Sequence, residues 1–130
     1  MQAYDEKLIA HSKMPLNRGR LRKYDVVYSL ENETCGDGMS VYLRMTGNRL
    51  DGIKFDGKGC VVSIAAASMV SQYVKGKTVK EIMDMDDESL KRVLDVKIER
   101  SRLRCANLFL RAVKRGLGAY SSSKGTDSAA

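Results

Sequence analysis

Residues 39–56, MSVYLRMTGNRLDGIKFD, carry the clearest structural signal in the chain. Every second residue from Met39 to Met45 is apolar, and this period of two predicts a half-buried β-strand. The turn residues TGNR follow, and Ile53 and Phe55 then resume the alternation. The stretch therefore predicts two antiparallel strands joined by a tight turn.

The segment before this hairpin predicts one more strand. Val26, Tyr28 and Leu30 recur at every second position, which again indicates a half-buried strand. A short helix is expected over residues 4–11, ahead of the chain's single proline, Pro15. The three strands together form an antiparallel meander.

The apolar period changes after Cys60, where the chain switches from strand to helix. Gly76 supplies a C-terminal stop for this helix. The residues that share one helical face are Ile64, Ala65, Met69, Tyr73 and Val74.

Three further helices are expected. Thr78 and Glu81 form a capping box that opens a short helix toward Asp84, and residues 86–94 form another. Apolar residues then recur at steps of three and four over residues 103–117, which predicts a longer amphipathic helix.

The order of these elements predicts an α+β fold, in which helices pack on one face of a three-stranded antiparallel sheet. The length of 130 residues fits one domain, expected over residues 1–120, with a flexible C-terminal tail at 121–130. A hydrophobic content of 43% supplies a core without disulfide bonds. No apolar run reaches the ~20 residues of a membrane helix, and Asp5 and Glu6 are atypical of a leader, so we expect a soluble cytoplasmic protein.

The net charge of +7 predicts attraction to acidic surfaces without naming a partner. Nucleic-acid binding is one hypothesis, but 6% aromatic residues, no Trp and no reading motif argue against it. The basic residues that prompt it are Arg100, Arg102, Arg104, Arg111, Lys114 and Arg115.

The three cysteines all fall in loops or at helix starts. Cys35 lies in the loop segment TCGD between the first two strands. Cys60 lies where the last strand gives way to a helix, close to backbone N–H groups that favour a thiolate. Cys105 lies in the opening turns of the last helix, beside Arg102 and Arg104.

Two interpretations of these cysteines stay open. Free cysteines are commonly buried without function, and gaps of 25 and 45 residues match no short zinc-finger signature. A shared site would select zinc, copper(I) or an iron–sulfur cluster, and a carboxylate such as Asp37 as fourth ligand would make that site more labile than four thiolates. The single histidine, His11, lies far from the cysteines in sequence.

These residues resemble the iron–sulfur cluster assembly scaffolds of the IscU, SufU and NifU N-terminal-domain family. The resemblance rests on TCGD at 34–37, GKGCVVSIAAASMV at 57–70, VKGK at 74–77 and Cys105, in that order and spacing. It covers about residues 5–118. Five residues match the family's N-terminal pattern: Ile9, His11, Pro15, Asn17 and Gly19.

The resemblance implies a SufE/IscU-like fold and an assembly site on Cys35, Asp37, Cys60 and Cys105. This site would hold zinc or iron at rest and a transient [2Fe-2S] cluster during assembly. Cys105 would accept persulfide sulfur from a cysteine desulfurase, and Asp37 would keep the cluster exchangeable for transfer to apo iron–sulfur proteins. The resemblance implies a scaffold rather than an enzyme, and it leaves a homodimer open.

Two features depart from the IscU branch of that family. Arg104 stands where that branch has a His directly before the third cysteine, and residues 98–102, IERSR, replace its chaperone-binding motif. The subfamily therefore stays open. The alternative function is that of a zinc-dependent sulfurtransferase of the SufU type, in which one thiolate leaves zinc to accept sulfur.

Overall fold

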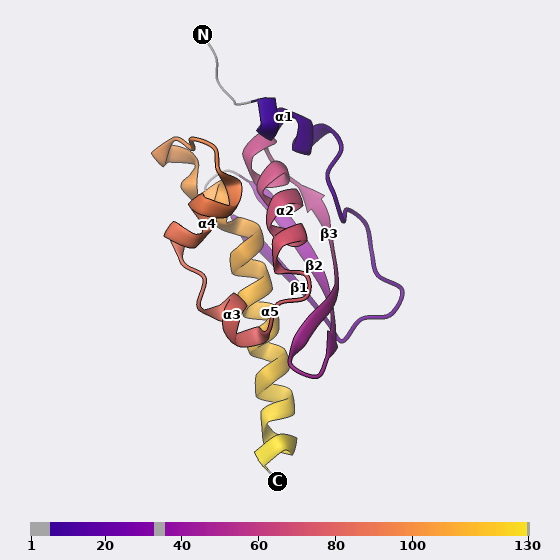
Figure 1. Cartoon of the computed structure of the whole chain (residues 1–130). Coiled ribbons are helices and arrows are strands. Elements are labelled where there is room, and N and C mark those ends of the chain that lie inside the picture. The colour runs from indigo at the N-terminus through magenta and orange to yellow at the C-terminus, as the bar shows by residue number, and fades with distance from the viewer. Residues whose placement is uncertain (1–5, 33–35, 130) are drawn as a thin grey trace.

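The computed structural model describes residues 6–32 and 36–129, and Figure 1 shows their arrangement. Three strands form one antiparallel sheet in the order β1-β2-β3, with β1 at Val26–Asn32, β2 at Asp37–Thr46 and β3 at Arg49–Lys58. The helices are α1 (Glu6–Lys13), α2 (Val61–Val74), α3 (Val79–Met83), α4 (Asp87–Leu94), the 3-10 turn η1 (Arg100–Arg102) and α5 (Leu103–Ala129). The predicted α+β meander is confirmed.

The sheet register follows from the apolar alternation. Val41 in the central strand pairs with Tyr28 of β1 and with Phe55 of β3. Met39, Val41 and Leu43 are buried, because alternate residues of a strand share one face and helix α5 packs against β2. An irregularity between Arg44 and Met45 shifts the register of β2 against β3 beyond that point.

Helix α2 lies at the centre of the molecule. Residues 62–71 are all buried, because β3, α5, α1 and α4 pack around them. The predicted single apolar face is therefore wrong for this helix: Tyr73, assigned to that face, is 45% exposed, whereas the serines of α2 are buried. Small alanine and serine side chains let the neighbouring elements approach from every side.

Helix α5 crosses the sheet at close range. The rings of Phe55 and Phe109 meet edge to face, with centroids 5.6 Å apart. A methyl group at Gly116 would lie 3.1 Å from Leu43 Cδ1 and 3.2 Å from Tyr28 Cβ, so glycine permits this approach. The helix continues to Ala129, whereas the sequence predicts a tail from residue 121.

The predicted helix start at Thr78 is confirmed. Thr78 Oγ1 accepts a hydrogen bond from the Glu81 N–H, and Glu81 Oε1 accepts one from the Thr78 N–H. The hydrogen bonds from Thr78 hold the pKa of Glu81 below its usual value. Asp86 caps α4 through its side chain, in which Oδ1 accepts a hydrogen bond from the Ser89 N–H.

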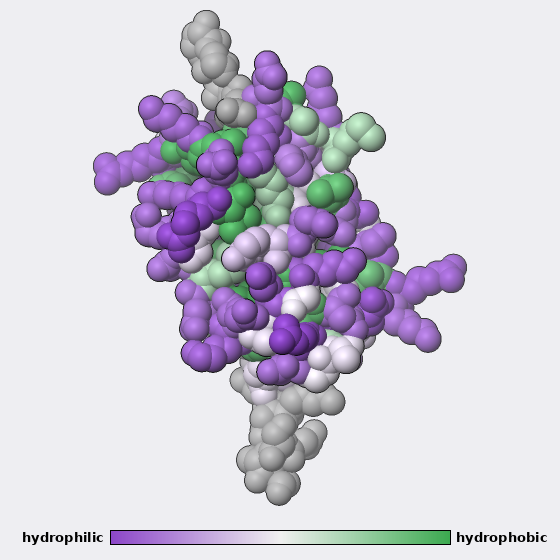
Figure 2. All heavy atoms as spheres, in the orientation of Figure 1, coloured by the Kyte–Doolittle hydropathy of each residue, from purple (hydrophilic) through white to green (hydrophobic). Residues whose placement is uncertain are grey.

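The surface in Figure 2 is mostly hydrophilic, with hydrophobic groups gathered in the upper half of that view, where α1, α2 and α4 meet. Leu16, Tyr73 and Val93 line a cavity of about 280 Å³ there. No helix within the described ranges is both long enough and apolar enough to cross a membrane.

Candidate metal centre

Asp37 is placed by the end of the sheet. It is the first residue of β2 and follows Gly36, whose φ of 75° turns the chain into the strand. The next residue, Gly38, pairs with Lys58 at the end of β3. Because β3 leads directly into Cys60, this register brings the Asp37 carboxyl group to the start of α2.

Cys60 is the N-cap residue of α2 and is half-buried. Its backbone is extended, with φ −78° and ψ 175°, and its side chain makes no capping hydrogen bond. The Cys60 carbonyl oxygen accepts two hydrogen bonds, from the Ile64 N–H at 3.1 Å and from Ser63 Oγ at 3.1 Å. The backbone therefore fixes Cys60, while its sulfur is left to face the rest of the site.

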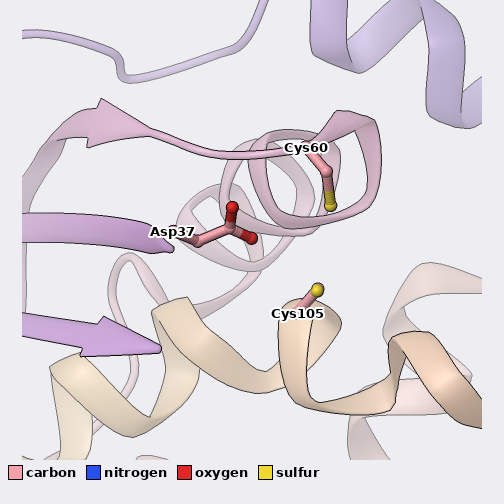
Figure 3. A group of neighbouring side chains, drawn as sticks. All are labelled: Asp37, Cys60 and Cys105. Carbon is pink, nitrogen blue, oxygen red and sulfur yellow. The ribbon is translucent and has the colours of Figure 1, made fainter. Parts of the chain in front are cut away.

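Cys105 lies in the first turn of α5 and is only 3% exposed. The turn η1 precedes it, and α5 packs against α2 and the sheet directly after it. This packing aims the Cys105 sulfur toward Cys60, as Figure 3 shows.

The structure brings Asp37, Cys60 and Cys105 together. One carboxylate oxygen and the two sulfur atoms all lie within 4.8 Å of one another. Tetrahedral coordination with bonds of about 2.3 Å would set such atoms ~3.8 Å apart, so small side-chain rotations would fit them to one ion. These donor types suit zinc and iron.

The Asp37 carboxylate provides independent support for a ligand here. Asp37 is 6% exposed, and its Oδ2 has no hydrogen-bond partner among the residues that the structure describes. A buried carboxylate oxygen without a donor is unfavourable, and a bound cation would compensate it. The residues present therefore fit a metal.

Cys35, the remaining predicted ligand, lies outside the described residues, two positions before Asp37. The ligand roles of all four residues, Cys35 included, stay predictions. Gly59, which the sequence places directly before Cys60, packs against this site together with Ser63, for which the sequence predicts no role. A glycine directly before Cys60 and a serine three residues after it were the available signal.

His11, the single histidine, contacts helix α2. Its Nδ1 lies 2.7 Å from the hydroxyl of Ser68, a buried residue of α2. Burial, and secondarily the charge of Lys7, lower the pKa of His11 below its ordinary value. These contacts give His11 a structural role in holding α1 on α2.

Basic residues border the site on one side. A cavity of about 270 Å³ beside Cys60 is lined by Ser12, Arg18 and Lys58. Part of the basic sequence run instead makes internal contacts. Arg111 donates to the Arg104 carbonyl oxygen, and Lys114 donates to that of Met85.

Fold and site together define a small α+β protein with a carboxylate–dithiol group suited to a metal. The model of the NifU-like N-terminal domain family matches residues 3–127. The chain is 31% identical, over 94% of its length and 79% of the relative's, to "Iron-sulfur cluster assembly scaffold protein IscU 1" of Archaeoglobus fulgidus. It is 29% identical to "Zinc-dependent sulfurtransferase SufU" of Bacillus subtilis, over 88% of both chains.

Solved structures share the fold. The crystal structure of a "Putative iron-sulfur cluster assembly scaffold protein for SUF system" from Fervidobacterium islandicum superposes with a TM-score of 0.75 and 25% identity, over 88% of this chain and 96% of that one. A NifU-like N-terminal protein from Brucella abortus gives a TM-score of 0.76 at 18% identity, over 92% and 94% of the two chains. The chain therefore belongs to the NifU-like N-terminal domain family, and proteins named IscU and SufU are among its relatives.

Proposed function

We propose that this chain accepts sulfur from a cysteine desulfurase, assembles a transient [2Fe-2S] cluster and transfers it to apo iron–sulfur proteins. The ligands are Cys35, Asp37, Cys60 and Cys105. The observation that carries the proposal is the buried Asp37 carboxylate, unbonded at Oδ2 within the described structure and within 4.8 Å of both sulfur atoms. Thiolates select iron–sulfur clusters and zinc, and the names of the relatives agree with this chemistry.

Sulfur enters as a persulfide, with Cys105 as the acceptor. The Cys105 thiolate attacks the outer sulfur of the desulfurase persulfide, the S–S bond of that persulfide breaks, and the donor cysteine leaves as a thiolate. A reductant then supplies two electrons for each sulfur that becomes sulfide. Because Cys105 is 3% exposed, this end of the molecule opens before the donor reaches it.

Asp37 makes the cluster transferable. A carboxylate oxygen is a harder ligand than a thiolate and binds these metals more weakly, so it is the first ligand to exchange. Asp37 is the first residue of β2, two positions after Cys35 in the sequence.

A second function, zinc-dependent sulfur transfer, is supported by the size of the site. Three ligand atoms within 4.8 Å of one another fit a single tetrahedral ion, and Cys35 would complete the set. A relative 29% identical to this chain is named as a sulfurtransferase of this kind. In this function the same residues would hold zinc, one thiolate would leave it and accept sulfur as a persulfide, and that sulfur would pass to an acceptor thiol before the thiolate returned, so that no cluster would form.

Sulfur transfer with and without iron separates these functions. The zinc-loaded chain is incubated with a cysteine desulfurase and cysteine, and bound sulfur is measured by mass spectrometry. Sulfur on Cys105 that becomes acid-labile sulfide only when ferrous iron and a reductant are added supports the scaffold.

Substitution of the ligands tests the same proposal. Cys35→Ser, Cys60→Ser and Cys105→Ser should each abolish stable cluster binding, with the fold checked by circular dichroism. Transfer of sulfur onward without iron would favour the sulfurtransferase. No sulfur on any cysteine would contradict both functions.

A further inference from the structure

Ser63 is a buried polar residue beside the metal site that the proposed function leaves without a role. It lies in the first turn of α2 and is 0% exposed. Its hydroxyl donates to the Cys60 carbonyl oxygen at 3.1 Å. That carbonyl already accepts the helical hydrogen bond from the Ile64 N–H, so the Ser63 bond is not needed to satisfy it.

Gly59 shows how close Ser63 lies to Asp37. A methyl group at Gly59 would lie 2.0 Å from Ser63 Oγ and 3.2 Å from Asp37 Cγ. The hydroxyl and the carboxyl group therefore pack against the same side of Gly59, in the space that a side chain would fill. Figure 3 shows the Asp37 carboxyl group beside the connection that leads from β3 into Cys60.

The energetics of releasing a metal give this proximity a consequence. While Asp37 ligates a metal, its charge is compensated. Once Asp37 dissociates from the metal, its buried carboxylate needs a hydrogen-bond donor, because a buried carboxylate without one is energetically unfavourable. Ser63 carries one O–H donor, which a side-chain rotation can move from the Cys60 carbonyl to the carboxylate.

We propose that Ser63 is a positioning residue for metal release: its hydroxyl binds the Asp37 carboxylate when that carboxylate leaves the metal. The proposal rests on the proposed function, since it concerns the same site. The hydroxyl stabilises the detached carboxylate and thereby speeds release of the metal or cluster. Gly59 has no side chain, and this leaves the two groups room to meet.

The test compares zinc release from four full-length proteins: the wild type, Ser63→Ala, Asp37→Ala and the double variant. Each is loaded with zinc alone, and loss to a chromophoric chelator is followed. Ser63→Ala should slow release about three- to tenfold, and it should have no further effect when Asp37 is already Ala. The matched control is Ser71→Ala, since Ser71 is equally buried in α2 but bonds to Ser68 and Asn17 instead.

A second measurement separates positioning from packing. In the metal-free protein, the ¹³Cγ chemical shift of Asp37 should move in Ser63→Ala and stay unchanged in Ser71→Ala. Unchanged release together with an unchanged Asp37 shift would overturn the proposal, and so would an equal slowing by Ser63→Ala in the Asp37→Ala background. Failure of the wild type to bind zinc or a cluster would overturn the proposed function as well, whereas bound zinc with no Ser63 effect would overturn only this inference.

Discussion

Asp37 differs from the cysteines beside it in its chemistry and in its surroundings. Its donor is an oxygen, and its Oδ2 has no hydrogen-bond partner within the described residues. Cys60 and Cys105 offer softer sulfur ligands that bind iron and zinc more tightly. At the scale of single residues, the proposed function therefore assigns to Asp37 the control of how quickly the site releases its metal.

Replacing Asp37 should lengthen the lifetime of the cluster. Asp37→Ala leaves three thiolates and removes the weakest ligand, so the reconstituted variant should retain its cluster and lose it several-fold more slowly than the wild type. The decay of visible charge-transfer absorption under a chelator measures this rate. A cluster as labile in Asp37→Ala as in the wild type would contradict the role of the carboxylate.

Gly59 should tolerate no side chain. A methyl group there would lie 2.0 Å from Ser63 Oγ and 3.2 Å from Asp37 Cγ, so Gly59→Ala should displace one of these groups and weaken zinc binding by about tenfold or more. Competition with a zinc indicator measures the affinity. The control is Gly118→Ala, because a methyl group at Gly118 meets no atom within 4 Å in the described structure. Equal zinc affinity in Gly59→Ala and the wild type would contradict the packing of the site.

At the scale of elements, hydrogen bonds hold α1 and the following residues 14–17 against α2. The hydroxyl of Ser68 accepts a hydrogen bond from the Leu16 N–H at 2.8 Å and lies 2.7 Å from His11 Nδ1. Asn17 donates to Ser71 Oγ, one turn further along α2. Because Ser68 accepts from Leu16, its own proton is available to His11, and this arrangement suits a neutral imidazole.

The stability of this contact should depend on pH through His11. The pKa of His11 is lowered from 6.5, so the unfolded chain binds the proton more readily than the folded chain does. The contribution of neutral His11 to the free energy of unfolding is complete above the unfolded-state pKa of 6.5. It is lost as the pH falls from 6.5 toward the lower pKa of the folded state. Urea unfolding of the metal-free protein at about pH 7.5 and about pH 5.5 should show a larger loss of stability in the wild type than in His11→Gln.

The carboxylates with shifted pKa values do not obscure this comparison. The pKa values of Asp51, Glu81 and Asp86 are lowered from 3.8, 4.5 and 3.8, chiefly by hydrogen bonds, so their contributions are lost only at more acidic pH. The same pH dependence of stability in His11→Gln as in the wild type would show that protonation of His11 is not coupled to unfolding.

The sequence predicts local elements well, because their signals are local. The alternation from Met39 to Met45 predicts β2, and the Thr78 capping box predicts the start of α3. The full burial of α2 depends instead on the elements packed around it. The apolar pattern within α2, which assigned Tyr73 to the buried face, does not predict those elements. The meeting of Asp37 with Ser63 across Gly59 likewise depends on strand register and helix position together.

At the scale of the whole molecule, the candidate metal site joins three elements that are distant in sequence. Asp37 belongs to β2, Cys60 opens α2 and Cys105 lies in the first turn of α5. A bound metal would link these ends, so part of its binding free energy stabilises the fold at this end of the molecule. The far ends of the same elements should gain little.

Metal binding should therefore increase hydrogen-exchange protection locally. The amides of residues 36–38, 61–63 and 103–106 should exchange about tenfold or more slowly in the zinc-loaded protein than in the metal-free protein. Amides at the centre of β2 and in the middle of α5 serve as internal controls. Equal protection of the site with and without zinc would contradict this coupling.

Cluster assembly itself is tested most directly by the iron, zinc and acid-labile sulfide bound per chain. The protein is incubated anaerobically with a cysteine desulfurase, cysteine, a reductant and ferrous iron, and is then separated from unbound ions. We predict equal amounts of iron and sulfide with a visible charge-transfer band. Zinc retained without sulfide would contradict cluster assembly and support sulfur transfer, and a protein without any bound metal would contradict the metal site itself.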